Sequence, residues 1–181
     1  MPEKLKKAGF NWLALGIEAA NSDVREGVSK GYSQDDIVRA VDELGKHGIY
    51  IIANYIFGLP DDTQETMQET LDLVIELNCE FANFYCTMAY PGSELYKDAI
   101  RESWELPETW SGYSQHSFDS RPLRTKHLDA ADVLKFRDDA FHTYFENPTY
   151  LDMIRDTFGD ETVAHIQEMT AHRLKRKLVT A

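Results

Sequence analysis

Three short apolar segments, separated by two amphipathic helical patterns, occupy the first half of this 181-residue chain. They cover residues 10–17, 49–59 and 81–88, and each is almost wholly apolar. A run of this kind and length is typical of a strand that is covered on both faces. Strands that alternate with helices pair in parallel through right-handed crossovers. The predicted fold class is therefore α/β, as a βα-barrel or a doubly wound sheet.

Capping residues predict where the intervening helices begin. Ser33, with Asp36 three residues later, is a variant of the capping box, and Asp62 with Glu65 has the same spacing. Ser22 is a further candidate N-cap, for a short helical turn after the first strand. These positions predict short loops between the strands and the helices that follow them.

The chain divides into three parts of different character. Residues 1–97 contain the alternating strands and helices, and residues 98–127 form an irregular segment rich in aromatic side chains. Residues 128–181 are predicted to be helical, with final helices over 149–158 and 160–178. A long irregular segment inside a compact domain is often functional. The aromatic loop at residues 104–120, with Trp104, Trp110, Tyr113 and Phe118, therefore either covers an apolar substrate or packs on the helices.

The charge balance excludes a general nucleic-acid binder. Lys and Arg number 19 against 31 Asp and Glu, a net charge of −12, whereas neutralising phosphates requires a basic surface. The cationic cluster at residues 172–177 is predicted to lie at a helix C-terminus or in a solvated tail. No apolar run reaches the roughly 18 to 20 residues that span a bilayer, and the N-terminus lacks the apolar core of a signal peptide. We expect a cytoplasmic protein with no membrane partner.

The cysteines form neither a disulfide framework nor a metal motif. Cys79 and Cys86 are the two cysteines of the chain, too few for a disulfide scaffold. Their spacing matches no zinc or iron–sulfur pattern. Both are predicted to be buried structural residues.

Polar side chains stand at the ends of the predicted strands, where parallel sheets bind their ligands. Glu18 ends the first strand, and a buried carboxylate is costly unless it is paired. It is either a ligand-binding group, the partner of Lys30, or a cap for the turn at residues 21–24. Asn54 interrupts the second apolar run, as a ligand-binding group or as a hydrogen-bonded core amide. Asp61 is an acid–base candidate, although its place before a helix favours capping.

Four segments, in this order and spacing, resemble the C-terminal half of the radical S-adenosylmethionine (radical SAM) enzyme core. They are Gly16-Ile17-Glu18, Lys30-Gly31-Tyr32-Ser33, Ile56-Phe57-Gly58-Leu59-Pro60-Asp61-Asp62-Thr63 and Ala89-Tyr90-Pro91-Gly92-Ser93-Glu94-Leu95-Tyr96. The resemblance covers roughly residues 4–97 and implies strands four to six of a six-stranded partial βα-barrel. It also implies an enzyme that holds S-adenosylmethionine and a [4Fe–4S] cluster. Such an enzyme acts through a 5′-deoxyadenosyl radical that abstracts hydrogen from a small-molecule substrate.

The resemblance further implies which residues bind S-adenosylmethionine. Glu18 belongs to the fourth-strand motif, near the ribose and methionine groups. The fifth-strand motif and a segment near the adenine complete the implied site with Asn54, Ile56, Gly58, Asp61, Met88, Ala89 and Tyr90. The chain departs from the family pattern where Ala19-Ala20 replace Ser-Gly, Asn54 replaces the first glycine and Asp61 replaces a glutamate.

The C-x3-C-x2-C motif that ligates the cluster in this family is absent from the chain. Three thiolates are needed, because the fourth iron stays open for the cofactor. We therefore expect a C-terminal fragment that is inactive alone and whose catalytic and metal-binding residues lie in a missing N-terminal half. Residues 122–128 and 136–141 resemble the helical extension of the subgroup that carries an upstream cobalamin-binding domain, so cobalamin is a further implied cofactor.

A three-stranded fragment is predicted to leave unpaired edges at residues 10–17 and 81–88, which invite pairing with another chain. We therefore expect the fragment to self-associate as a dimer. Two other functions stay open. One is a stand-alone α/β binding or scaffold module, and the other is an ordinary βα enzyme that uses Glu18 and Asp61 as acid and base. Within the radical SAM family, methyl transfer, cyclisation and C–C bond formation all stay open.

Overall fold

Three parallel strands form one sheet in the order β1-β2-β3. They are β1 (Trp12–Glu18), β2 (Tyr50–Phe57) and β3 (Phe81–Cys86), and the computed structural model describes residues 1–27 and 30–179. The α/β class predicted from the sequence is confirmed. Strand β2 ends two residues before its apolar run does, because Gly58 turns the chain with a φ of 78°.

Helices alternate with the strands in the order that the sequence predicts. Helices α2 and α3 lie between β1 and β2, and α4 lies between β2 and β3. None of the helices in residues 1–27 and 30–179 is both long enough and apolar enough to cross a membrane. Their bounds are α1 (Pro2–Lys7), α2 (Ser22–Glu26), α3 (Gln34–Lys46), α4 (Gln64–Leu77), α5 (Glu94–Arg101), the 3-10 helix η1 (Trp110–Tyr113), α6 (Ala130–Phe145), α7 (Pro148–Phe158) and α8 (Asp160–Thr170).

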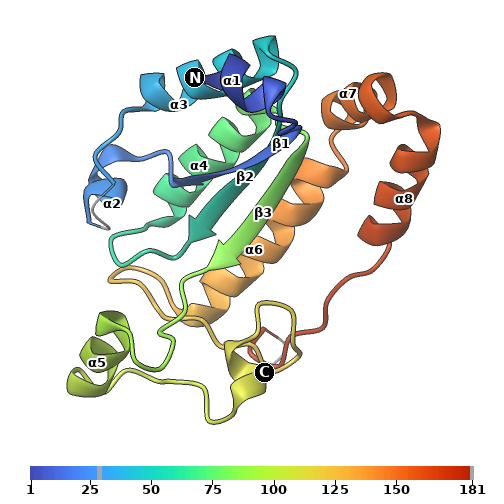
Figure 1. Ribbon diagram of the computed structural model, residues 1–181. Helices are drawn as coiled ribbons and strands as arrows, with labels where there is room; N and C mark the ends of the chain where they lie inside the picture. Colours follow the sequence, from blue (N-terminus) through green and yellow to red (C-terminus); the bar gives the residue numbers. More distant parts are fainter. Residues whose placement is uncertain (28–29, 180–181) are drawn as a thin grey trace.

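Helices α3, α4 and α6 cover one face of the sheet, and the opposite face is open (Figure 1). The side chains of β2 alternate accordingly. Ala53, Tyr55 and Phe57 on the covered face are buried, and the positions between them are half-buried. The buried set packs in one cluster with Met67 of α4 and Tyr144 of α6. The open face is therefore the side of the sheet that a ligand or another chain can reach.

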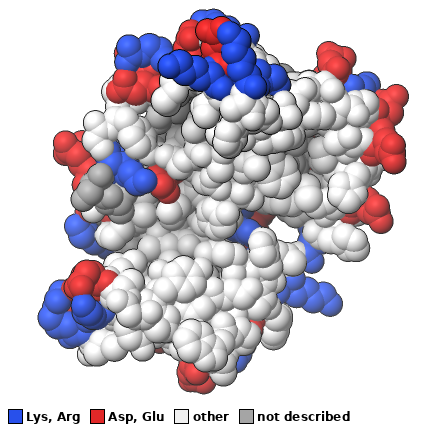
Figure 2. All heavy atoms as spheres, viewed as in Figure 1, with Lys and Arg blue, Asp and Glu red and all other residues white. Residues whose placement is uncertain are grey.

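The open face carries apolar side chains around a pair of carboxamides. Strand register and side-chain alternation bring Trp12, Ala14, Gly16, Ile52, Asn54, Asn83 and Tyr85 to this face. Figure 2 looks onto it and shows most of the charged side chains at the periphery. An exposed apolar surface with a charged rim is typical of a binding surface.

No further strand of the described residues pairs with the outer edge of β3, as predicted for residues 81–88, but side chains cap part of that edge. The Gln115 carboxamide accepts a hydrogen bond from the Cys86 N–H and donates one to the Cys86 carbonyl, both at 2.9 Å. The Arg137 guanidinium donates to the Phe84 carbonyl at 2.8 Å. These side chains satisfy backbone groups near the carboxyl end of β3. Sequence patterns do not reveal them, because the partners are far apart in the chain.

The outer edge of β1 is different. Near its carboxyl end the Tyr32 hydroxyl donates to the carbonyls of Gly16 and Ile17, at 2.7 and 3.1 Å. Along the rest of β1, no side chain of the described residues caps the edge as Gln115 does on β3. A further strand can therefore pair with the sheet at β1.

Removing the cap from β3 is expected to promote self-association. Gln115→Leu keeps the side chain large but leaves the Cys86 N–H and carbonyl unpaired on an edge strand, which is a template for another chain. Sedimentation over a wide concentration range should show more dimer than in the wild type. Gln68→Leu, on the exposed side of α4, is the matched control. An unchanged monomer–dimer balance in Gln115→Leu would contradict the role of the cap.

The helix starts confirm one sequence prediction and correct another. Helix α3 begins after Ser33, and Ser33 and Asp36 form the predicted reciprocal capping box. Helix α2 is capped by Asn21 rather than by Ser22, because the Asn21 Oδ1 accepts the N–H of Asp23 at 3.1 Å.

Helix α8 ends at Thr170, so the helix predicted to run to residue 178 is wrong. The cationic segment 172–177 follows without helical structure. Residues 172–175 and 177 are exposed, as predicted for a solvated tail. Arg176 is the exception, because it is only 3% exposed and its Nε lies 2.7 Å from Asp138 Oδ2 on α6. The buried ion pair with Asp138 and the hydrogen bonds to backbone carbonyls hold Arg176 in a segment that is not helical.

Candidate functional site

The carboxyl ends of the parallel strands β1, β2 and β3 lie together at one end of the sheet, at the arrowheads in Figure 1. The segments at the strand ends, residues 16–21, 54–61 and 87–92, therefore converge there, because parallel strands share the same direction. A cavity of about 180 Å³ lies at this end, lined in part by Gly58 and Thr87. The carboxyl end of the three strands is therefore the candidate site.

Glu18 lies in a strained turn at the end of β1. Its φ is 67°, a left-handed conformation that residues other than glycine rarely adopt. The N–H of Ala19 donates to the Ile17 carbonyl at 3.0 Å, which makes a three-residue γ-turn centred on Glu18. A γ-turn with positive φ is rare and strained, and strain of this kind clusters at functional sites.

The turn folds the Glu18 carboxylate back over Gly16. A Cβ atom at Gly16 would lie 2.8 Å from Glu18 Oε1, so a larger residue there would displace the carboxylate from this position. The same Oε1 lies 3.2 Å from the Lys30 Nζ, and the Glu18 side chain is 14% exposed. A hydrogen bond from Lys30 to Glu18 and their charge attraction raise the pKa of Lys30. The ion pair with Lys30, one of the sequence alternatives, is therefore present.

Asn54 is a hydrogen-bonded amide on the open face. Its Nδ2 donates to the carbonyls of Leu15 and Ile52, at 3.1 and 3.3 Å. Its Oδ1 accepts a hydrogen bond from the Nδ2 of Asn83 at 3.0 Å. Asn83 was not predicted from the sequence. Its signal was the strand register, which places it beside Asn54.

Gly58 and Ile56 have packing roles at the end of β2. Gly58 has a φ of 78°, and a Cβ there would lie 2.4 Å from a methyl of Val133. Ile56 is half-buried against a small cluster that includes Ala19 and Leu59. The resemblance assigned both residues to the cofactor, whereas the contacts seen here join the strand end to α6 and to the β1 turn.

Asp61 and Asp62 behave differently from each other. Asp61 is partly exposed and forms an ion pair with Lys126. Asp62 is 1% exposed, and its Oδ2 accepts the N–H groups of Gly58 and Leu59 at 3.0 and 2.9 Å. Burial raises the pKa of Asp62, and these hydrogen bonds oppose the rise. Asp62 therefore shapes the turn after β2.

The cap of α4 corrects the sequence prediction of Asp62 with Glu65. Thr63 is the N-cap, and its hydroxyl accepts the Thr66 N–H at 3.3 Å. The Thr66 hydroxyl in turn accepts the Thr63 N–H at 2.9 Å. Threonine supplies both halves of this box, so the carboxylate of Asp62 is free to serve the preceding turn.

The three residues assigned to the adenine side differ in exposure. Met88 and Ala89 are buried, in two separate apolar clusters. Tyr90 is 50% exposed, and its ring centroid lies 6.1 Å from that of Tyr113. Of the three side chains, only that of Tyr90 is accessible to a ligand.

Arg25 and Tyr32 contribute to the site and were not singled out from the sequence. Arg25 is 2% exposed, and its guanidinium Nη1 donates to the Ala19 carbonyl at 2.7 Å and also to the Ala20 carbonyl. The guanidinium carbon lies 5.8 Å from the centroid of the Tyr32 ring. The signal available in the sequence was an arginine that follows soon after an apolar strand.

The residues fit S-adenosylmethionine but not the iron–sulfur cluster. Glu18, Lys30 and the Asn54–Asn83 pair supply the carboxylate, ammonium and amide groups that suit the hydroxyls and the amino-acid group of S-adenosylmethionine. An iron–sulfur cluster does not fit. Cys79 and Cys86 are buried, and burial raises the pKa of each thiol to about 12. The described residues contain no group of three potential metal ligands.

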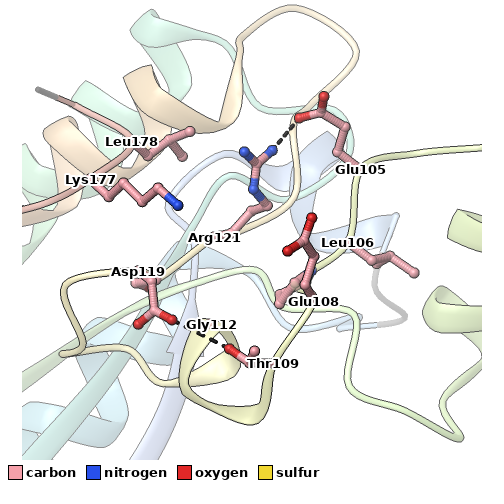
Figure 3. A pocket seen from close by; sticks show the side chains of 11 residues that line it. Glu105, Leu106, Glu108, Thr109, Gly112, Asp119, Arg121, Lys177 and Leu178 are labelled. Carbon is pink, nitrogen blue, oxygen red and sulfur yellow. Dashed lines mark hydrogen bonds and ion pairs between the residues drawn. The ribbon is translucent and has the colours of Figure 1, made fainter. Parts of the chain in front are cut away.

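A second cavity, of about 470 Å³, lies away from the strand ends (Figure 3). The irregular segment lines one side and the C-terminal segment lines the other. Arg121, Glu108 and Lys177 reach toward one another across it, and Arg121 pairs with Glu105. The lining combines these charged side chains with apolar ones, Leu106, Pro107 and Leu178.

Residues 1–74 match the family model described as the Radical SAM superfamily. An uncharacterized methyltransferase of Pyrococcus horikoshii is 27% identical over 154 residues, which cover 85% of this chain and 32% of the relative. The bacteriochlorophyllide d C-12(1)-methyltransferase of Chlorobaculum tepidum is 28% identical, over 58% of this chain and 24% of the relative. The anaerobic magnesium-protoporphyrin IX monomethyl ester cyclase of Rubrivivax gelatinosus is 26% identical, over 81% of this chain and 25% of the relative.

The chain thus spans 32% or less of the length of these curated relatives. Among solved structures, that of coproporphyrinogen III oxidase (HemN) from Escherichia coli, described as a radical SAM enzyme, aligns with a TM-score of 0.47 and 18% identity. The alignment covers 63% of this chain and 34% of that one.

Proposed function

We propose that this chain, whose residues 1–74 match the family model of the Radical SAM superfamily, supplies the S-adenosylmethionine-binding part of a radical SAM enzyme. The observation that carries the proposal is the convergence of the three strand ends, where Glu18 lies in a strained turn beside Lys30. Ligands of parallel βα folds bind at this end of the strands. The site therefore has the place and the polar groups that the cofactor requires.

The residues divide between direct contact and support. Glu18, Lys30 and the paired amides of Asn54 and Asn83 are accessible from the open face and would contact the ribose and amino-acid groups. Tyr90 is the accessible side chain on the adenine side. Gly58 would shape the site through its backbone turn and its close contact with Val133. Met88 and Ala89 would do so through packing, because their side chains are buried in apolar clusters. When bound, S-adenosylmethionine supplies the radical that abstracts hydrogen from a substrate.

The cluster and the missing strands would come from a separate N-terminal half. We propose that this half pairs with β1, because Gln115 and Arg137 already cap the carboxyl end of the β3 edge. It would also cover the open apolar face. The chain alone would then be inactive, since its described residues offer no cluster ligands.

The proposed reaction class is radical methylation or cyclisation of a small-molecule substrate. Its support is the set of relatives, which are named as methyltransferases and as a cyclase. Cobalamin would serve the methylation branch. Its only support is the resemblance of residues 122–128 and 136–141 to the extension of the cobalamin subgroup.

S-adenosylmethionine binding tests the proposal directly. We expect the amide resonances of the 15N-labelled chain to shift on titration with S-adenosylmethionine, and the shifts to concentrate at Gly16, Glu18, Lys30 and Tyr90. Glu18→Gln should weaken the response, because a neutral amide loses the charge attraction to Lys30 and accepts hydrogen bonds less strongly than a carboxylate. Glu168→Gln on α8 is the control. Shifts confined to other elements, or none at high cofactor concentration, would overturn the proposal.

A further inference from the structure

The turn after β1 is held by three side chains from elsewhere in the chain. Arg25 donates to the carbonyls of Ala19 and Ala20. Tyr32 donates to the carbonyls of Gly16 and Ile17, and the Thr70 hydroxyl of α4 accepts the Ala20 N–H at 3.0 Å. Consecutive backbone groups on both sides of Glu18 are thus fixed from outside the turn.

Arg25 is an unusual choice for this place. It is 2% exposed, and its guanidinium has no carboxylate partner among the described residues; its hydrogen bonds go to backbone carbonyls. Its Nε has no hydrogen-bond partner there either. A buried charge without a counter-ion is costly, and an apolar side chain would fill the same space at lower cost. Packing alone does not explain the residue.

Glu18 has a complementary cost. A non-glycine residue at a φ of 67° costs free energy, and such conformations persist only when the surrounding structure over-determines them. The return for this strain is the position of the carboxylate, which lies over Gly16 and beside Lys30 on the open face. An extended backbone at residue 18 would send the side chain elsewhere.

We propose that Arg25 is a positioning residue: with Tyr32 it clamps the β1–α2 turn so that the Glu18 carboxylate is presented to the ligand on the open face. The identity of the ligand rests on the proposed function, whereas the clamping of the turn does not. Arg25 does not touch the ligand. It acts through the carbonyls of Ala19 and Ala20, which fix the left-handed backbone of Glu18.

The preference for glycine over alanine at residue 18 measures the clamp without any ligand. Glu18→Gly and Glu18→Ala both remove the carboxylate, and they differ in their tolerance of positive φ. With the clamp intact, the glycine variant should have the larger folding equilibrium constant, by about tenfold. In the Arg25→Met background the turn is free to relax, and the ratio should fall below about threefold. Arg25→Lys, which still donates to the carbonyls, should restore it.

Ser103, with a φ of 56°, provides the matched control, since its preference for glycine should not depend on Arg25. If Arg25→Met does not fold, Tyr32→Phe removes only one hydroxyl from the clamp and should lower the ratio at residue 18 in the same direction. A ratio that stays near tenfold in both backgrounds would overturn the proposal.

Cofactor binding separates the clamp from the proposed function. S-adenosylmethionine should bind the Arg25→Met chain about tenfold more weakly than the wild type, and Arg25→Lys should recover most of the affinity. A lowered glycine preference with unchanged affinity would show that the clamp does not position a binding group, which overturns the proposal. If the wild type does not bind S-adenosylmethionine at all, the proposed function fails, and the glycine preference alone decides the clamp.

Discussion

The Gly58→Ala variant is expected to lose about 3 kcal/mol of folding free energy. The left-handed backbone at a φ of 78° costs an alanine about 1–2 kcal/mol. The new Cβ would lie 2.4 Å from a methyl of Val133, which is fully buried on α6, and overpacking of this kind costs about 1–3 kcal/mol. Urea unfolding followed by circular dichroism measures the loss.

Gly92→Ala separates the two costs. Gly92 has a φ of 93° and nothing within 4 Å of the Cβ position, so it should lose only the backbone part, about 1–2 kcal/mol. Val133→Ala in the Gly58→Ala chain should recover part of the loss, because the smaller side chain removes the clash. Equal losses in Gly58→Ala and Gly92→Ala would contradict the packing role of Gly58.

This result matters for reading the site. The resemblance assigns Gly58 to the cofactor, and a substitution that abolished binding would be taken as support for that assignment. The contact with Val133 offers a different cause, since a shift of α6 would disturb the strand end indirectly. Binding data on Gly58 variants therefore need to be compared at matched stability.

The elements of the sheet were accessible to sequence reasoning because their signals are local. An apolar run marks a buried strand wherever it pairs, and a capping box such as Ser33 with Asp36 involves residues three apart. The segments that meet at the strand ends could be predicted for the same reason, since parallel strands bring their carboxyl ends together.

The rest depended on contacts between distant residues. The Gln115 cap on Cys86 joins residues 29 apart, and the γ-turn at Glu18 is fixed by hydrogen bonds from Arg25 and Tyr32. A local rule predicted Asp62 as a helix cap, whereas in the structure its carboxylate accepts the N–H groups of Gly58 and Leu59. Propensity gives the candidates for each role, and tertiary structure selects among them.

In the C-terminal segment, too, contacts with distant residues decide the role of a side chain, that of Arg176. The Arg176 guanidinium donates to both oxygens of Asp138, at 2.7 and 2.8 Å. It also donates to the carbonyls of Ser117 and Gln115, at 2.8 and 3.0 Å. It thus ties the C-terminal segment and the irregular segment to α6, beside the cap on β3. A run of basic residues predicted a solvated tail, whereas one of its members is a buried anchor.

Arg176→Met is accordingly expected to destabilise the chain by about 3 kcal/mol. Removing one partner of a buried ion pair costs about 3–5 kcal/mol, and the lower end applies because Asp138 keeps a hydrogen bond from Arg137 at 2.8 Å. Arg155→Met, which loses only exposed ion pairs, should cost less than about 1 kcal/mol. Equal losses in the two variants, by urea unfolding at neutral pH, would show that Arg176 is not an anchor.

The pH dependence of the Arg176→Met loss identifies its cause. Burial alone would raise the pKa of Asp138, but hydrogen bonds from Arg176 and Arg137 outweigh it and lower the pKa below 3.8. A carboxyl with a lowered pKa adds stability above its unfolded pKa and loses it as the pH falls through the folded one. The difference between wild type and Arg176→Met should therefore shrink below about pH 4.

His116 adds a second window with the same direction. Burial, and then the charges of Arg137 and Arg176, lower the pKa of His116 below 6.5. A histidine with a lowered pKa costs stability as the pH falls below its unfolded value, because the folded state resists protonation. Without Arg176 this cost is smaller, so the gap between wild type and variant should begin to narrow below about pH 6.5. A gap that stays constant from neutral pH to pH 3 would mean that Arg176 stabilises the chain by packing and not by charge.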